Sequence, residues 1–158
     1  MQRWLMKTEP GAFSIADLAR KRREPWDGVR NYQARNYLRA MRKGDGVLVY
    51  HSNCAVPGVV GIAKVARAAY PDPTQFDPKH LHFDPASRRD DPRWSLVDIA
   101  YVRTLKRNIA LDELKGRPEL AGLALIQRGN RLSVLPVSAA QWDFILGLER
   151  GGAHHESR

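Results

Sequence analysis

Two periodicities divide the chain into short strands and short helices. Apolar runs bounded by turn residues predict strands over residues 4–7, 47–51, 59–66, 97–105 and 131–134. Apolar positions three and four residues apart predict helices over residues 15–19, 34–41, 111–115 and from 138 onward. Residues 120–126 fit neither pattern. Irregular loops separate the strands without a regular strand–helix alternation, so the pattern favours a mixed or antiparallel barrel-like sheet with peripheral helices.

Polar residues mark where two of the predicted helices begin. Ser14 and Asp17 have the spacing of a capping box, in which each side chain bonds the backbone N–H of the other residue. Asn31 precedes a helix whose apolar stripe includes Ala34 and Leu38, and it is placed to cap that helix.

A long loop separates the second half of the predicted sheet from the first. Residues 71–92 contain five of the ten prolines of the chain, a density that no regular element tolerates. Loops of this length are functional or disordered. Phe76, Leu81, His82 and Phe83 are apolar anchors within it, so we predict an ordered loop.

Length and composition indicate one soluble domain. The chain has 158 residues, of which 43% are hydrophobic and 27% charged, and this predicts one folded domain over residues 1–150 with a disordered tail over residues 151–158. No apolar run approaches the roughly 20 residues of a membrane-spanning helix, and charge comes too early for a secretory signal. A single cysteine, Cys54, excludes an internal disulfide framework, so we expect a cytoplasmic protein.

Positive charge is concentrated in one segment. The net charge of the chain is +9, and residues 20–43 contain nine basic and only two acidic residues. Arg35, Arg39 and Arg42 repeat at helical spacing beside the apolar stripe. Such a surface attracts a phosphate backbone through a salt-dependent, sequence-independent interaction. The alternative is a solvated helix surface that serves only solubility.

The sequence contains no recognisable constellation for catalysis or metal binding. Gly-rich phosphate-binding motifs are absent. His80 and His82 lack a third ligand at a suitable spacing, and Cys54 is more typical of a small buried residue than of a nucleophile. Nothing in the sequence places Glu9 and Asp27 together as a pair of carboxylates. We therefore predict neither a cofactor, nor a metal, nor an enzymatic activity.

Aromatic and polar residues at element boundaries indicate a small recognition pocket. Trp26 lies between Pro25 and the start of a predicted helix, Trp94 lies between the proline-rich loop and a predicted strand, and His51, Ser52 and Asn53 lie at the exit of another strand. Two aromatic faces with convergent polar groups can hold a planar base. The alternative is that all four tryptophans belong to the core.

Three further polar residues have two interpretations. Asn31 either reads a base edge or only caps its helix. Arg131 and Ser133 either face the pocket or lie on the solvent side of a strand.

Long sequence strings resemble the EVE-domain family. The strings are Trp4-Leu5-Met6-Lys7-Thr8-Glu9-Pro10, Trp26 to Asn36, Tyr50 to Cys54 with Pro57-Gly58, Ala69 to Asp72, Pro92-Arg93-Trp94, and Arg131 to Val134 with Pro136-Val137. They occur in the order typical of the family and span about residues 2 to 149. Thr8 is a departure, because the family favours serine there, but the hydroxyl is kept.

The resemblance implies an α+β, PUA-like fold: a mostly antiparallel β-barrel flanked by short helices, similar to the YTH domains that read methylated adenine. It makes Trp26 and Trp94 candidate walls of an aromatic cage and Asn31 and Ser52 candidates for reading the base edge. The full base-pocket set is Trp26, Val29, Asn31, His51, Ser52, Asn53 and Trp94, and the candidate phosphate-binding residues are Arg30, Arg35, Arg39 and Arg42.

The prediction is a non-catalytic reader that binds DNA or RNA through an extruded or single-stranded, modified base, with no membrane partner. The alternatives are an RNA-binding module without modified-base specificity, a nucleic-acid-processing enzyme such as a nuclease, and a pocket for a free nucleoside.

Overall fold

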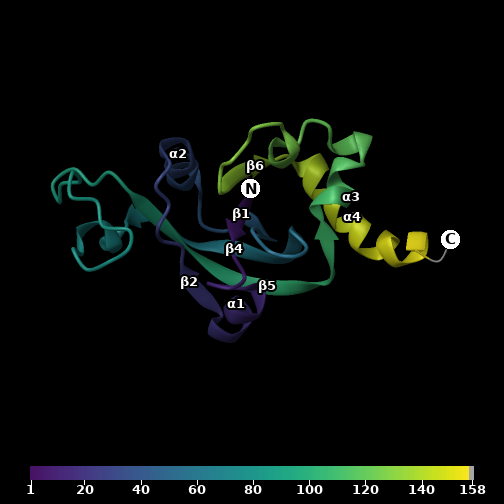
Figure 1. Cartoon of the computed structure of the whole chain (residues 1–158), viewed down its shortest axis with the longest axis horizontal. Coiled ribbons are helices and arrows are strands. Elements are labelled where there is room, and N and C mark those ends of the chain that lie inside the picture. The colour runs from purple at the N-terminus through teal and green to yellow at the C-terminus, as the bar shows by residue number, and fades with distance from the viewer. Residues whose placement is uncertain (157–158) are drawn as a thin grey trace.

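A six-stranded mixed sheet forms the centre of the protein in the computed structural model, which describes the backbone of residues 1–156 and the side chains of residues 1–151 (Figure 1). Its strands are β1 (Arg3–Thr8), β2 (Arg23–Pro25), β3 (Gly46–His51), β4 (Gly58–Pro71), β5 (Ser95–Ala110) and β6 (Val134–Val137), in the order β2-β5-β4-β3-β1-β6. All neighbouring strands in this order are antiparallel except β1 and β3, which are parallel.

The sheet is open and does not close into the predicted β-barrel, whereas the α+β class and the predominance of antiparallel pairing are confirmed. The two edges are β2 and β6, and each contains a proline, Pro25 and Pro136. Proline has no N–H to donate to a further strand and is therefore typical of sheet edges. Both edge strands are also short, with three residues in β2 and four in β6, and short edge strands disfavour pairing with a further strand.

Helices begin where the capping residues predicted them. Ser14 and Asp17 form the expected capping box, and Asn31 accepts a hydrogen bond from the backbone N–H of Ala34 at 3.0 Å. The helices are α1 (Ile15–Lys21), α2 (Tyr32–Ala40), α3 (Leu111–Lys115) and α4 (Ala139–Glu156), with 3₁₀ turns η1 (Pro73–Phe76), η2 (Pro118–Leu120) and η3 (Ala124–Ile126). The ambiguous segment 120–126 thus begins at the last residue of η2 and ends with η3, and it forms neither a strand nor an α-helix.

Strand side chains alternate between two hydrophobic clusters. Trp4 and Met6 belong to one cluster and Leu5, between them, belongs to the other, as expected for a period of two residues. α1 and α2 contribute to the first cluster, and α3 and α4 contribute to the second. In Figure 1, α3 and α4 lie near the end of β5, far from the teal loop that precedes β5.

The proline-rich loop is ordered, as predicted, but by a polar side chain rather than by apolar anchors. Gln75 is fully buried, and its amide nitrogen donates to the carbonyls of Asp72 (2.7 Å) and Trp94 (2.8 Å) at the two ends of the loop. By contrast, Leu81 is 90% exposed and Phe83 is 37% exposed. The amide of Gln75 therefore takes the place of a hydrophobic core in this loop.

Two predicted boundaries near the C-terminus differ from the structure. The strand expected over residues 131–134 is β6, at Val134–Val137, and it contains Pro136 because an edge strand tolerates proline. α4 continues to Glu156, so part of the predicted tail lies within a helix, and residues 157–158 are outside the described part. Among the described residues, no helix is long and apolar enough to cross a membrane.

Candidate nucleic-acid interface

A cavity of about 890 Å³ lies at the C-terminal ends of the inner strands β1 and β3. Because these strands are parallel, their last residues, Thr8 and His51, are paired, and the residues that follow the two strands lie at the same end of the sheet. We call this space the Trp26 cavity. Its walls are Lys7, Thr8, Glu9, Ala12, Trp26, Asp27, Gly28, Val29, Arg30, Ser52, Asn53, Leu81, His82, Arg131 and Ser133.

Trp26 forms the aromatic part of the wall and is held firmly. Its side chain is 8% exposed, and the ring of Phe13 packs edge-on against it at a centroid distance of 6.0 Å. The backbone N–H of Trp26 donates to the carbonyl of Val97 at 2.8 Å, which extends the pairing of β2 with β5. The indole is therefore in place before any ligand arrives.

Asp72 attaches the Trp26–Arg30 segment to the proline-rich loop. One carboxylate oxygen of this fully buried residue accepts from the backbone N–H of Gly28 (2.9 Å) and from the guanidinium of Arg30 (3.1 Å). The other accepts from both the backbone N–H (2.8 Å) and the hydroxyl (2.6 Å) of Thr74. Burial alone would raise the pKa of Asp72, but these hydrogen bonds together hold it below its usual value.

Polar groups of both signs surround the cavity. Lys7 is partly buried, which lowers the pKa of its ammonium group, and it lies 5.9 Å from the ring centroid of Tyr50. Burial, followed by the nearby charge of Asp72, raises the pKa of the Asp27 carboxyl. Asn53 has a left-handed backbone (φ 51°) and donates to the carboxylate of Glu9 at 3.2 Å. The cavity thus offers hydrogen-bond donors and an acceptor within reach of one aromatic face.

Five residues of the sequence prediction share this cavity: Trp26, Val29, Arg30, Ser52 and Asn53. Their common position follows from the parallel pairing of β1 and β3 and from the anchoring of the Trp26–Arg30 segment by Asp72.

Trp94 does not line the cavity, so the predicted cage of two facing indoles is corrected. Its side chain is 5% exposed and stacks on Tyr32 at a centroid distance of 4.9 Å and an interplanar angle of 26°. The indole N–H donates to the carboxylate of Asp84 at 2.7 Å. Trp94 closes the base of the proline-rich loop because its backbone and side chain are both bonded within that loop. The interpretation of Trp94 as a core residue is the correct one.

Asn31 and His51 also have structural partners and do not line the cavity. Asn31 is the cap of α2, the alternative given from the sequence. Nε2 of His51 accepts from the backbone N–H of Ile15 at 3.0 Å, which holds the first turn of α1. Burial lowers the pKa of this imidazole, which is consistent with a neutral ring that accepts a hydrogen bond.

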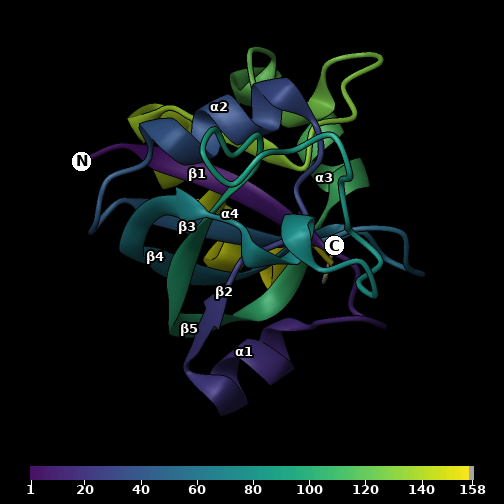
Figure 2. The ribbon, with the colours of Figure 1, turned by 90° about the vertical axis from the view of Figure 1, so that its left-hand side faces the viewer.

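The arginines of α2 attach the helix to the proline-rich loop, as the neighbouring positions of the two segments in Figure 2 illustrate. Arg35 donates to the carbonyl of Arg93 at 3.0 Å. Arg39 donates to the hydroxyl of Ser95 (2.9 Å) and to the carbonyl of Pro92 (3.1 Å). Because the guanidinium groups of Arg35 and Arg39 already donate to acceptors within the protein, the structure argues against the prediction that they bind phosphate.

Sequence reasoning missed several residues of the cavity. Asp27 was considered only as half of a carboxylate pair, and Lys7 and Leu81 were assigned no part in the pocket. Ser133 and Arg131 were left with two interpretations, and both line the cavity. The missing information was the parallel pairing of β1 and β3, which no local pattern reveals.

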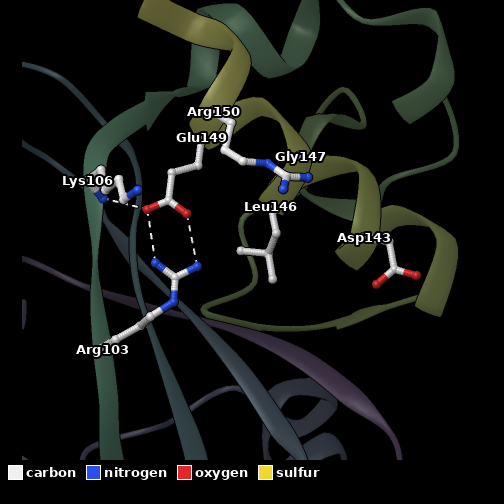
Figure 3. A pocket seen from close by; sticks show the side chains of 7 residues that line it. All are labelled: Arg103, Lys106, Asp143, Leu146, Gly147, Glu149 and Arg150. Atoms are coloured by element: carbon white, nitrogen blue, oxygen red, sulfur yellow. Dashed lines mark hydrogen bonds and ion pairs between the residues drawn. The ribbon is translucent and has the colours of Figure 1, made fainter.

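A second hollow of about 630 Å³ lies between β5 and α4 (Figure 3). Its buried carboxylate, Glu149, accepts from both terminal nitrogens of Arg103 at 2.9 Å and from the backbone N–H of Lys106. Hydrogen bonding from Arg103 lowers the pKa of Glu149. The carboxylate is fully occupied in joining α4 to the sheet, so this hollow is a structural joint. In the part of the chain that the structure describes, no group of three or more His, Cys, Asp or Glu residues could hold a metal ion.

Comparison with known proteins establishes the family. Residues 2–148 match the family model described as the EVE domain. The chain belongs to the EVE-domain family. Thymocyte nuclear protein 1 of Mus musculus is 48% identical, over 92% of this chain and 73% of the relative. The resemblance inferred from the sequence strings is therefore confirmed.

Solved structures of EVE-domain relatives share the fold closely. A protein from Pseudomonas syringae has a TM-score of 0.91 and 49% identity, covering 93% of this chain and 99% of the relative. Human thymocyte nuclear protein 1, crystallised in complex with DNA containing 5-methylcytosine, has a TM-score of 0.90 and 45% identity, covering 94% of this chain and 98% of the relative. None of these relatives is named as an enzyme, in keeping with the predicted non-catalytic role.

These relatives also overturn the expected compartment. The mouse, rat and human relatives are named nuclear proteins, so the cytoplasmic prediction is wrong. The physical reason is that a low cysteine count separates reducing from oxidising compartments, and it does not distinguish the cytosol from the nucleus.

Proposed function

We propose that this protein is a non-catalytic reader of nucleic acid that holds one modified base in the Trp26 cavity. The observation that carries the proposal is a buried, pre-positioned indole in a cavity that also offers polar groups of both signs. The complex of the human relative with DNA containing 5-methylcytosine makes that DNA the first ligand to test.

Each part of a methylated cytosine has a partner in the proposed complex. The ring stacks on Trp26, a contact worth about 1–3 kcal/mol per base. The carboxylate of Asp27 accepts from the exocyclic amino group, the usual acidic contact to cytosine. Val29, which is buried at 7% exposure and lines the cavity, supplies apolar surface for a methyl group.

The basic rim provides the phosphate contacts. Arg131 is exposed beside the cavity, and the chain as a whole carries +9. A base reaches such a cavity only after it leaves the stack, and the unstacking costs a few kcal/mol. Phosphate neutralisation by counterion release offsets part of that cost and makes binding salt-dependent.

Substitution of Trp26 tests the proposal. Anisotropy titrations would use labelled duplexes with one 5-methylcytosine or one plain cytosine, and RNA of the same sequence. We expect Trp26→Ala to weaken binding of the methylated duplex about tenfold or more, and Trp26→Phe to retain most of the affinity. Trp142→Ala, outside the cavity, is the matched control for loss of an indole.

The outcomes separate the candidate functions. Retained affinity and retained discrimination in a folded Trp26→Ala protein would remove the cavity from the binding site. Equal affinity of the wild-type protein for RNA and for both duplexes would favour an RNA-binding module without modified-base specificity.

A further inference from the structure

Leu81 is an exposed apolar side chain at the rim of the Trp26 cavity. At 90% exposure it is the most exposed large hydrophobic side chain among the described residues. A single exposed leucine is ordinary on a protein surface, so exposure alone carries no argument. Leu81 differs because it lines the same cavity as the stacking residue Trp26.

The loop presents Leu81 on a rigid turn. The backbone N–H of Phe83 donates to the carbonyl of His80 at 3.1 Å, and the backbone N–H of His80 donates to the carbonyl of Asp77 at 3.0 Å. The guanidinium of Arg30 donates twice to the carbonyl of His82, at 2.8 and 3.1 Å. The leucine therefore stands on a braced support, and its exposure does not come from a loose loop.

Arg30 connects this support to the cavity wall. The same guanidinium binds the carboxylate of Asp72, which also holds the backbone of Gly28 two residues after Trp26. The position of Leu81 relative to the indole is consequently set by one network of partly buried hydrogen bonds.

We propose that Leu81 is a wedge that enters the base stack of a duplex at the position vacated by the extruded base. The inference rests on the proposed function, since a wedge is needed only where a base enters the cavity. Proteins that distort DNA insert apolar side chains of this kind between base steps. An exposed leucine gains burial when it fills the vacated space, and that gain favours the extruded state of the base.

The test compares duplex with single strand. Anisotropy titrations would use a duplex with one 5-methylcytosine and the same methylated strand alone, because a single strand has no vacated position to fill. We expect Leu81→Ala to lower the ratio of duplex to single-strand affinity about tenfold. Val102→Ala, an exposed apolar residue on β5 that does not line the cavity, should leave the ratio unchanged.

A second readout follows the base stack directly. With 2-aminopurine beside the methylated cytosine, the wild-type protein should raise the fluorescence on binding, and Leu81→Ala at saturating concentration should reduce this rise. If Leu81→Ala leaves the ratio of duplex to single-strand affinity unchanged, the wedge is overturned. An equal loss of both affinities would then make Leu81 a simple contact at the cavity rim, and no loss of either would leave it without a part in binding.

Failure of the proposed function has a different signature. Trp26→Ala is expected to weaken binding of both duplex and single strand, because both need the stacking surface. If Trp26→Ala binds duplex and single strand with the affinities of the wild-type protein, the cavity is not the base site, and this conclusion holds for any result with Leu81→Ala. If Trp26→Ala weakens binding of both duplex and single strand while Leu81→Ala leaves the ratio of the two affinities unchanged, the cavity remains the base site and only the wedge is excluded.

Discussion

Replacement of Gly28 by alanine is expected to destabilise the protein at the Trp26 cavity. Gly28 has φ +83°, a left-handed conformation that costs an alanine about 1–2 kcal/mol. Its added Cβ would also lie 2.7 Å from Cε1 and 2.9 Å from Nδ1 of His82. Such overpacking typically costs about 1–3 kcal/mol more.

The chain contains a matched control for the backbone contribution. Gly44 has φ +95°, and a Cβ there would meet nothing within 4 Å. Gly44→Ala should therefore lower the free energy of unfolding by the backbone contribution alone, about 1–2 kcal/mol. Gly28→Ala should lower it by about 2–5 kcal/mol, the sum of the two contributions.

Denaturant unfolding of five proteins would measure the effect: wild type, Gly28→Ala, Gly44→Ala, His82→Ala, and Gly28→Ala combined with His82→Ala. A double-mutant cycle with His82→Ala alone isolates the contact between the two positions. We expect His82→Ala to recover most of the excess loss in the Gly28→Ala background. The reasoning is refuted if Gly28→Ala costs no more than Gly44→Ala, or if the cycle shows no coupling.

Three further predictions concern charge. Asp72→Asn should lower the free energy of unfolding by about 3 kcal/mol, because each carboxylate oxygen accepts from two donors and the amide nitrogen of asparagine would face one of these pairs of donors. Chemical denaturation would measure the loss, with Asp77→Asn, at an exposed position in the same loop, as the control. The folded-state pKa of His51 lies below its ordinary value of 6.5, so its contribution to stability is present above that pH and is lost as the pH falls through and below it. Thermal unfolding against pH should show this loss, and His51→Gln, which can still accept from Ile15, should lack that part of the slope. Arg131→Gln should reduce the slope of log affinity against log salt by about one without changing stability, and an unchanged slope would exclude a phosphate contact there.

Much of the local structure could be read from the sequence because its signals act over a few residues. Ser14 bonds Asp17, and Asn31 bonds Ala34, so both helix starts are encoded within one turn. The apolar runs likewise predicted five of the six strands, with errors at their ends such as the displacement of β6, whereas the short polar strand β2 was not predicted. The apolar run from Trp4 to Met6, followed by turn residues, was enough to indicate a strand.

The candidate site was only half predictable. Trp26 was identified as an indole in a connecting segment and Ser52 as a short polar residue after a strand, and both line the cavity. Trp94 has the same local pattern and is buried against Tyr32. A boundary position does not reveal which way a side chain points, because that depends on segments that meet it from elsewhere in the chain.

By itself, the amino-acid sequence determined the family, the basic character, the helix caps and most of the strands. The tertiary structure alone decided that the sheet stays open, that β1 pairs in parallel with β3, and that Gln75 binds the carbonyl of Trp94 at the far end of the proline-rich loop. It also decided that Arg35 and Arg39 bind loop carbonyls. The physical reason is range: caps and periodicity act within one element, whereas each of these features joins groups far apart in the sequence and forms only when the fold brings them together.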